Sequence, residues 1–155
     1  MTLPTHLLAG LVIGKFTGNY PLALASAVLI DLDHLPSYFR HKVLFKPKEL
    51  FASIRDANDP WEDQRGFLHN ILLWSAISFL IFLANAGIGL VLCLAVFSHL
   101  ALDALDSAPF YPFAPSKRVH FRGFVKYFSL QEMVFALGLL AVFIFRVYLV
   151  KWNGF

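Results

Sequence analysis

Charge is what this sequence has least of. Only 15% of its 155 residues are Asp, Glu, Lys or Arg, and 58% are hydrophobic, whereas a soluble domain carries about 25% charged residues. A domain of this length has a large surface for its volume, and so few charges cannot keep all of that surface in water. The composition therefore argues against an ordinary soluble globule, and equally against a disordered chain, a collagen-like repeat or a coiled coil.

Cysteine is nearly absent as well. The single Cys93 excludes an internal disulfide framework and any cysteine-rich zinc module. The sequence also lacks a glycine-rich phosphate loop and a Gly-x-Ser-x-Gly nucleophile elbow. Any catalytic or metal site must therefore be built from other residue types.

The sequence instead contains long stretches without charged residues. Lys15 is the only charged residue between positions 1 and 30, and residues 70–102 and 133–145 hold none. A transmembrane helix needs about 20 predominantly apolar residues. The 70–102 stretch is too long for one crossing and fits two helices with a turn at 85–89.

Breaker residues divide the first stretch in the same way. The segment Gly18-Asn19-Tyr20-Pro21 splits it into halves of about 5–17 and 21–35. A last helix is expected over about 130–151.

The expected architecture is an all-α, multi-pass helical bundle of about five helices in a membrane, forming a single domain over residues 1–155. It consists of two short antiparallel hairpins, 5–35 and 69–106, and a C-terminal transmembrane helix. Each hairpin leaves and returns on the same side, so both polar segments, about 36–66 and 107–129, lie on one membrane face. Short loops rich in Lys and Arg mark the cytoplasmic side, which predicts a cytoplasmic location for this face.

The second polar segment is basic. It carries Lys117, Arg118, Arg122 and Lys126 and no acidic residue. A basic surface loop of this kind attracts anionic headgroups, so membrane lipid is the expected partner. Four positive charges without a nucleic-acid-binding motif give no reason to expect nucleic acid as a partner.

The remaining ionisable residues gather at the same face, each at the end of an expected helix. They are His6, Asp31, Asp33, His34, His69, His99, Asp103, Asp106 and Glu132. The spacing of His99, Asp103 and Asp106 is i, i+4 and i+7, which places them on one face of a helix, and Asp31 shares a face with His34. A cluster of histidines and carboxylates is therefore expected at one end of the bundle.

These residue types indicate metal chemistry. Histidine nitrogen and carboxylate oxygen together suit zinc, and also manganese or iron. Simpler interpretations exist for each part: His6 as a helix cap, Asp31 to Pro36 as a helix stop, and His99 with Asp103 as a hydrogen-bonded pair between helices. Because an ionisable residue in a membrane is costly unless it is paired, a cation shared by the whole set is the preferred interpretation.

Four short motifs, in this order, resemble a known family. They are Thr5-His6 with Gly10, Asp31-Leu32-Asp33-His34, Arg65-Gly66-Phe67-Leu68-His69-Asn70 and Ser98-His99-Leu100-Ala101-Leu102-Asp103. They resemble the YdjM-type family of bacterial inner-membrane proteins, which are described as membrane-bound metal-dependent hydrolases. The resemblance covers nearly the whole chain and implies a location in a bacterial inner membrane.

That family is in turn similar to the zinc-dependent phospholipase C and single-strand nuclease group, which are all-helical multi-zinc phosphoesterases. The ligand order of that group maps onto His6, Asp31 or Asp33, His69, and His99 with Asp103, and it implies that Asp103 bridges two metals. The candidate metal ligands as a whole are His6, Asp31, Asp33, His34, His69, His99 and Asp103. They would hold one to three divalent ions, with zinc preferred.

The same resemblance suggests a hydrolytic mechanism. A divalent ion lowers the pKa of water toward ~7 and so supplies hydroxide at neutral pH. A second ion or Arg65 would stabilise charge on a phosphoryl oxygen, and Asp33 or Asp106 would act as general base or orient a ligating histidine. At the headgroup level, a phospholipid or a lipid-linked phosphate is the expected substrate.

The competing hypothesis is a non-catalytic membrane protein with a structural metal site, either a scaffold or regulatory protein or a transporter. A transporter needs polar groups near the middle of the bilayer, and Asn85, Ser75 and Ser78 are the only modest candidates. A b-type haem protein would need facing histidine pairs, whereas carboxylates accompany the histidines here. The hydrolase is the preferred hypothesis.

Overall fold

A computed structural model gives the structure of the protein and describes residues 1–56, 61 and 65–152. Within these residues the chain is helical and contains no β-strand, only two isolated bridge pairs. The helices are α1 (Leu3–Thr17), α2 (Tyr20–Leu29), η1 (Ile30–Asp33), α3 (His34–Arg40), α4 (Pro47–Arg55), η2 (Phe67–His69), α5 (Ile71–Ala84), α6 (Ala86–Leu105) and α7 (Leu130–Trp152), where η marks a 3-10 helix. The predicted all-α bundle is confirmed, and its five expected helices correspond to α1, α2, α5, α6 and α7.

The turn between α1 and α2 lies where the sequence predicts a helix break. Gly18 ends α1 with a φ of 77° and donates its N–H to the Gly14 carbonyl. Glycine adopts this left-handed conformation without strain. Asn19 then caps α2, because its side chain accepts the Leu22 N–H, and Pro21 lies in the first turn, where a missing donor costs nothing.

Asn85 alone separates α5 from α6. Its side chain accepts the Ile88 N–H at 3.0 Å and so caps α6. A Cβ on Gly89 would come within 2.4 Å of the Phe82 backbone, so glycine at this position allows the two helices to approach closely. The turn is tighter than the 85–89 segment that the sequence predicts.

α2 does not end in a loop but passes through η1 into α3. The predicted helix over 21–35 winds as an α-helix only to Leu29, tightens to a 3-10 turn and resumes as α3. A 3-10 stretch within a helical run often marks a functional hinge or local strain, and this one carries Asp31 and Asp33. The polar segment 36–66 is also more regular than predicted, because it contains most of α3 and all of α4.

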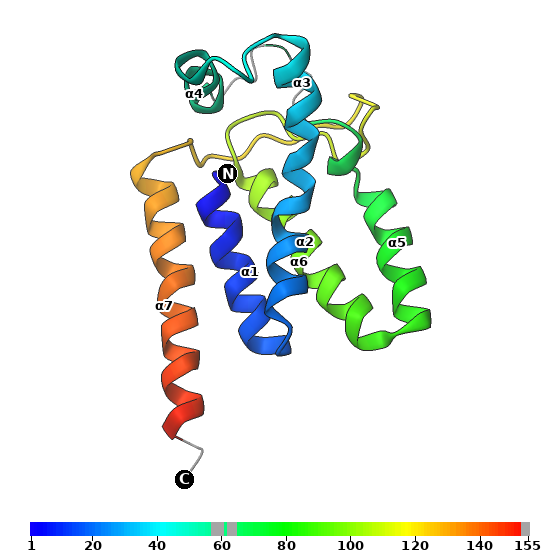
Figure 1. Cartoon of the computed structure of the whole chain (residues 1–155), viewed down its shortest axis with the longest axis vertical. Coiled ribbons are helices and arrows are strands. Elements are labelled where there is room, and N and C mark those ends of the chain that lie inside the picture. Colours follow the sequence, from blue (N-terminus) through cyan, green and yellow to red (C-terminus); the bar gives the residue numbers. More distant parts are fainter. Residues whose placement is uncertain (57–60, 62–64, 153–155) are drawn as a thin grey trace.

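The two ends of the bundle differ (Figure 1). The N-terminus, α3, α4 and the 107–129 segment lie at one end, which we call the polar end. Both hairpin turns and the C-terminal end of α7 lie at the other end. α1 packs against α2, α6 and α7, while α5 packs against α6. Because both hairpins start and finish at the polar end, the ionisable residues at their ends come together there.

The 107–129 segment closes the polar end instead of lying loosely on a surface. Phe110 is buried and joins a core cluster with side chains of η1, α5 and α6. Its N–H and carbonyl pair with those of Phe121 at 2.9 Å, and the Ser107 N–H bonds to the Val125 carbonyl at 2.8 Å. The predicted surface loop is therefore a packed cap on the bundle.

Two helices of the described chain are long and apolar enough to cross a membrane. They are α6 over Ala86–Leu105 and α7 over Leu130–Tyr148, and α5 is apolar but shorter. α7 contacts the bundle along its α1 side. Its exposed large side chains include Leu130, Val134, Leu137, Phe145 and Tyr148. So large an apolar surface is unfavourable in water, which supports a membrane location.

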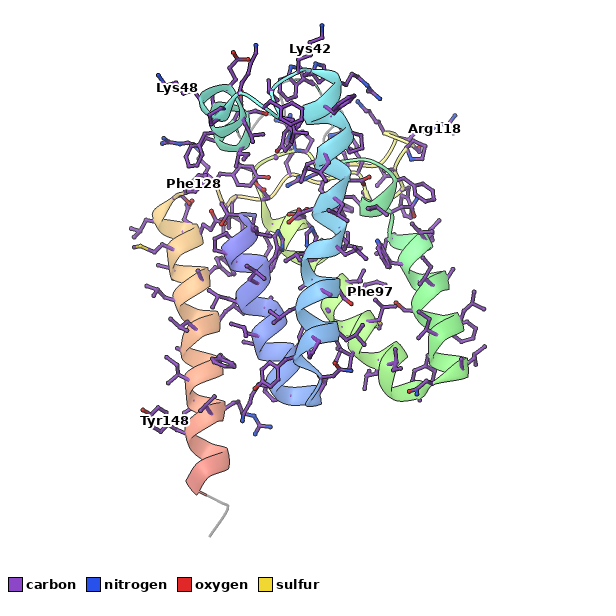
Figure 2. The ribbon with its side chains drawn as sticks, in the orientation of Figure 1. Lys42, Lys48, Phe97, Arg118, Phe128 and Tyr148 are labelled. Atoms are coloured by element: carbon purple, nitrogen blue, oxygen red, sulfur yellow. The ribbon has the colours of Figure 1, made fainter. Side chains whose placement is uncertain are left out.

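Charged side chains concentrate at the polar end. Figure 2 shows Lys42, Lys48 and Arg118 there, whereas Tyr148 lies toward the opposite end. The basic residues predicted to face lipid headgroups are all exposed, namely Lys117, Arg118, Arg122 and Lys126.

Candidate metal centre

Four separate elements bring the predicted cluster together at the polar end. His6 comes from the start of α1, Asp31 from η1, His69 from η2, and His99 and Asp103 from the end of α6. His6, His69 and His99 are fully buried, and Asp103 is almost so. Imidazoles and carboxylates buried this deeply need polar partners, so their contacts decide what the site can do.

Asp103 lies at the centre of three histidines. Its Oδ2 is 3.2 Å from His69 Nε2 and 3.5 Å from His99 Nε2, and its Oδ1 is 3.4 Å from His6 Nε2. The i, i+4 spacing of His99 and Asp103 gives the expected shared face of α6.

Asp31 extends the cluster toward α3. Its Oδ1 lies 3.6 Å from His99 Nε2 and 3.4 Å from His34 Nε2. Three overlapping groups result, in each of which one donor atom per residue lies within 4.8 Å of the others. They are His6 with Asp31 and His99, Asp31 with His34 and His69, and His69 with His99 and Asp103.

Contacts at Nδ1 fix the orientation of two of the imidazole rings, those of His99 and His69. His99 Nδ1 is 2.7 Å from the Ala27 carbonyl oxygen, which can only accept, so Nδ1 carries the proton. His69 Nδ1 lies 3.2 Å from Asp33 Oδ2 in the same way. In both rings Nε2 therefore faces the cluster, which is the orientation of a histidine that ligates a metal through Nε2.

Four buried imidazole nitrogens of these described residues lack a hydrogen-bond partner. Among the described residues, His69 Nε2 and His99 Nε2 are buried without one, as are His6 Nδ1 and His34 Nδ1. The His6 ring also stacks on His99, with ring centroids 3.8 Å apart. Buried polar atoms without partners are rare in folded proteins and need an explanation. A bound cation supplies one, so these residues fit a metal.

Asp33 lies beside this donor set. Its Oδ2 accepts the Leu68 N–H at 2.6 Å, the His69 N–H at 3.2 Å and the His69 ring N–H. A Cβ on Gly66 would lie 3.3 Å from Asp33 Oδ1, so glycine gives this carboxylate room. Of the two acids that the sequence leaves open, Asp31 belongs to the possible metal groups, and Asp33 orients His69.

Arg65 and Asp106 form a buried ionic network next to the centre. Arg65 Nη2 donates to Asp106 Oδ2 at 2.9 Å and to the Tyr127 hydroxyl at 3.0 Å, and its Nη1 donates to the Ala108 and Pro109 carbonyls. Asp106 also accepts from the Ala108 N–H and from the Met1 ammonium. These four donations use the terminal N–H groups of Arg65, so the residue predicted to stabilise a phosphoryl oxygen is held in a network.

Burial and neighbouring charges fix the protonation states of two residues of this network, Arg65 and Tyr127. Burial alone would lower the pKa of Arg65, but the carboxylates of Asp103 and Asp106 outweigh it and raise the pKa above its usual value. Burial also raises the pKa of Tyr127 well above its ordinary value, against the opposing effect of Arg65. Arg65 is thus a permanent cation and Tyr127 a neutral hydroxyl.

Three residues in or next to the centre and its ionic network carry no clear signal in the sequence. The Met1 ammonium lies 2.7 Å from Asp103 Oδ1, and Tyr127 comes from the basic segment with no motif around it. Glu132 was expected only at a helix end, but it accepts the Thr2 N–H and the hydroxyls of Thr2 and Thr5. The Thr5-His6 pair is therefore anchored to the start of α7.

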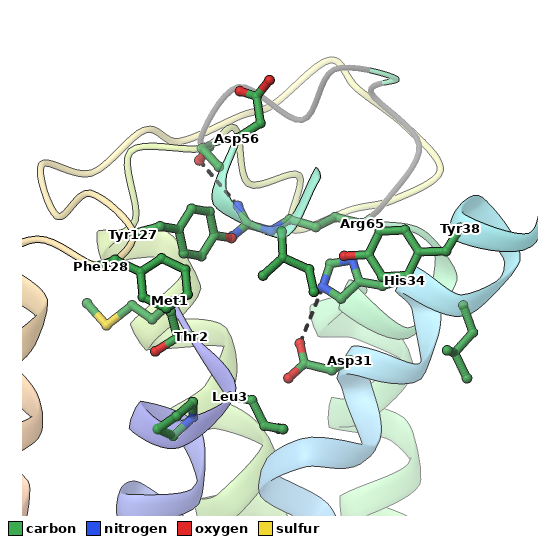
Figure 3. Close-up of a pocket in the computed structure, with 14 residues that line it drawn as sticks. Met1, Thr2, Leu3, Asp31, His34, Tyr38, Asp56, Arg65, Tyr127 and Phe128 are labelled. Atoms are coloured by element: carbon green, nitrogen blue, oxygen red, sulfur yellow. Dashed lines mark hydrogen bonds and ion pairs between the residues drawn. The ribbon is translucent and has the colours of Figure 1, made fainter. Parts of the chain in front are cut away.

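A pocket of about 290 Å³ opens beside the centre. Asp31, His34, Arg65 and Tyr127 line one part of it, and its other walls include Leu3 and Leu35, as Figure 3 shows in part. A molecule bound in this pocket would meet the cluster through Asp31 and His34. The site therefore combines a buried donor set with an accessible, amphipathic cavity.

The comparisons with known proteins give a family. Neither the search of curated proteins nor the search of solved structures gave a match. The family model described as YdjM inner membrane protein matches residues 1–154, and two apolar helices of this structure agree with a membrane location. The chain belongs to the YdjM inner membrane protein family.

Proposed function

We propose that this protein is a membrane-bound, metal-dependent hydrolase, a zinc phosphoesterase that acts on a phospholipid or a lipid-linked phosphate. One observation carries the proposal. Among the described residues, four buried imidazole nitrogens lack a hydrogen-bond partner, and two of them, His69 Nε2 and His99 Nε2, face a cluster that also contains Asp31 and Asp103, next to an open pocket. A purely structural cluster would leave those nitrogens uncompensated.

Six residues would hold one to three ions: His6, Asp31, His34, His69, His99 and Asp103. Mixed nitrogen and oxygen donors of this kind suit zinc. A bound divalent ion would supply a nucleophile from water at neutral pH and offset charge on a phosphoryl oxygen. Asp33 keeps His69 in the ligating tautomer, and the Ala27 carbonyl does the same for His99.

The remaining predicted catalytic residues act around the pocket. Arg65 lines it and brings a permanent positive charge to an anionic group there. Because its terminal N–H groups already bind other partners, Arg65 would attract the anionic group through its charge and would not hydrogen-bond to it directly. Asp106 holds Arg65 and the Met1 ammonium in place, so its role is positioning.

The membrane setting follows from the distribution of charge. We infer a multi-pass arrangement in the inner membrane, with the metal centre on the cytoplasmic face. The polar end carries the exposed basic residues, including Lys42, Lys48 and Arg118, and such residues mark the cytoplasmic side. The centre would then lie at the depth of the lipid headgroups.

One observation favours a second candidate, a scaffold or regulatory protein with a structural metal site. The cluster joins α1, η1, η2 and α6, so an ion there would tie these elements together regardless of chemistry. The open pocket beside Asp31 is what this alternative leaves unexplained.

The deciding experiment combines metal analysis with hydrolysis. The full chain, purified in detergent, is expected to contain zinc and to hydrolyse bis-p-nitrophenyl phosphate and a phospholipid. His99→Ala should lose both, whereas His120→Ala, in an exposed loop, should keep both. Asp31→Asn, at a partly exposed ligand position, serves as a second variant if His99→Ala does not fold. Metal without hydrolysis would favour the structural site, and a protein without metal would refute both.

A further inference from the structure

Part of the pocket beside the metal centre is lined by an apolar surface. Leu3, at the start of α1, and Leu35, in α3, both line the pocket, and each is about half exposed. We infer that this surface is an acyl-chain subsite for a lipid with an anionic phosphate headgroup, which reaches the centre sideways from the bilayer. The inference rests on the proposed function for the headgroup end of the site and adds a separate binding region to it.

A continuous track of apolar side chains leads to the pocket along α2, η1 and α3. Leu29, Leu32, Leu35 and Phe39 follow one another at intervals of three, three and four residues, so they share one helical face. All four are between 42% and 69% exposed. Only Leu35 of these also lines the pocket, so the track passes the pocket at that residue.

The other side of the pocket is apolar as well. Leu3 and Pro4 line it from α1, and Phe128, 55% exposed, lines it from the residues just before α7. Figure 3 shows Leu3 at one side of the cavity and Arg65 at the opposite side, with Asp31 and His34 between them. The lining is thus ionic around Asp31, His34 and Arg65 and apolar around Leu3, Leu35 and Phe128, and we call the apolar part the mouth.

This division fits an amphiphile better than a small soluble ester. A water-soluble phosphoester would occupy the ionic part and leave Leu3 and Leu35 without a partner. In a bilayer the track along α2 contacts lipid chains in any case, so a substrate chain would only replace another chain there. The substrate chain thus stays in apolar surroundings without a hydrophobic penalty, while the headgroup would lie beside Asp31, His34 and the positive charge of Arg65.

Photo-crosslinking tests the subsite without relying on turnover. The full-length, zinc-loaded chain is reconstituted in phosphatidylcholine vesicles with a phosphonate analogue of phosphatidic acid that carries a diazirine in its acyl chain. The phosphonate keeps the anionic headgroup but resists hydrolysis. After illumination, mass spectrometry measures labelling around Leu3 and Leu35, and around Leu137 on the exposed side of α7 as the reference for bulk lipid.

We expect unlabelled phosphatidic acid, but not extra phosphatidylcholine, to suppress labelling at Leu3 and Leu35 and to leave Leu137 unchanged. If unlabelled phosphatidic acid suppresses labelling equally at Leu3, Leu35 and Leu137, the mouth holds bulk lipid only. If Leu3 and Leu35 are not labelled at all, something else covers them, such as a second copy of the chain. Either result overturns the subsite.

A matched pair of variants sharpens the test. Leu35→Trp fills the mouth and should reduce the competed labelling at Leu3 on the order of tenfold, whereas Leu137→Trp should not change it. Hydrolysis of bis-p-nitrophenyl phosphate is measured in parallel. Hydrolysis without competed labelling refutes the subsite alone, and competed labelling without hydrolysis refutes the proposed enzyme but leaves the lipid site.

Discussion

His69 shows how a single residue is prepared as a ligand. Asp33 accepts its ring N–H and two backbone N–H groups, so the orientation of the ring depends on one carboxylate. We expect Asp33→Ala to weaken zinc binding by about 10–100-fold, because the loss of such an orienting partner commonly has that effect. Zinc affinity is measured by competition with a chromogenic chelator.

The matched control for that variant is Glu49→Ala. Glu49 is an exposed carboxylate that pairs with Lys46 at 3.0 Å on α4, and its loss should leave zinc affinity unchanged. Equal affinity in wild type and Asp33→Ala would contradict the role assigned to Asp33.

Arg65 gives a second prediction at this scale. Arg65→Met removes a buried, paired guanidinium, and among the described residues Asp106 then keeps the Met1 ammonium as a cationic partner. Breaking a buried ion pair from one side costs about 3–5 kcal/mol. We expect a loss of stability in this range, measured by denaturant unfolding in detergent. Arg118→Met, in the exposed part of the cap, should be close to neutral, and a similar small effect for Arg65→Met would contradict the network.

The sequence predicts the members of the cluster better than their separate roles. Helix spacing alone is enough to place His99 with Asp103, and hairpin topology places His6 and His69 near them. Asp31 and Asp33 lie two residues apart, and which of them faces the cluster depends on the 3-10 winding of η1, which the sequence does not reveal.

At the scale of elements, predictability follows the strength of local signals. The turn at Gly18 and the cap at Asn85 are encoded by residues whose backbone preferences are strong, and both helix breaks are predicted. α4 is short and begins after Lys46 at a proline. Its amphipathic pattern spans only about two turns, which is too short to stand out from a polar loop.

The packing of the 107–129 segment on α6 also depends on one residue. A Cβ on Gly123 would lie 1.9 Å from the Leu105 carbonyl oxygen, which is backbone and cannot move aside. We therefore expect Gly123→Ala to displace the cap, to lower the unfolding temperature and to weaken zinc binding through Asp106, whose carbonyl accepts the Gly123 N–H. Thermal unfolding and zinc content are the measurements.

Gly138→Ala is the control for the cap. No atom outside the helix lies within 4 Å of a Cβ at this position of α7, so the substitution should leave stability unchanged or raise it slightly. A Gly123→Ala protein as stable as the control would show that the cap is not held by this close approach.

At the scale of the whole molecule, the scarcity of charge and its location have one cause. In the proposed multi-pass arrangement, helices cannot carry charge along their length without cost, so most ionisable residues lie near helix ends. Short antiparallel hairpins then return those ends to the same face, where the residues meet as a cluster. The apolar composition and the buried ionic site are therefore two consequences of a single topology.

That topology predicts opposite accessibility for the two ends of the bundle. Single cysteines are introduced at Gly87, exposed in the first turn of α6, and at Arg118, in the exposed cap, in a Cys93→Ala background. A membrane-impermeant maleimide should label Gly87→Cys in intact cells and should label Arg118→Cys only after the inner membrane is opened, because basic loops remain on the cytoplasmic side. Labelling of both from the same side would contradict a bundle that crosses the membrane, and the reverse pattern would place the metal centre on the outer face.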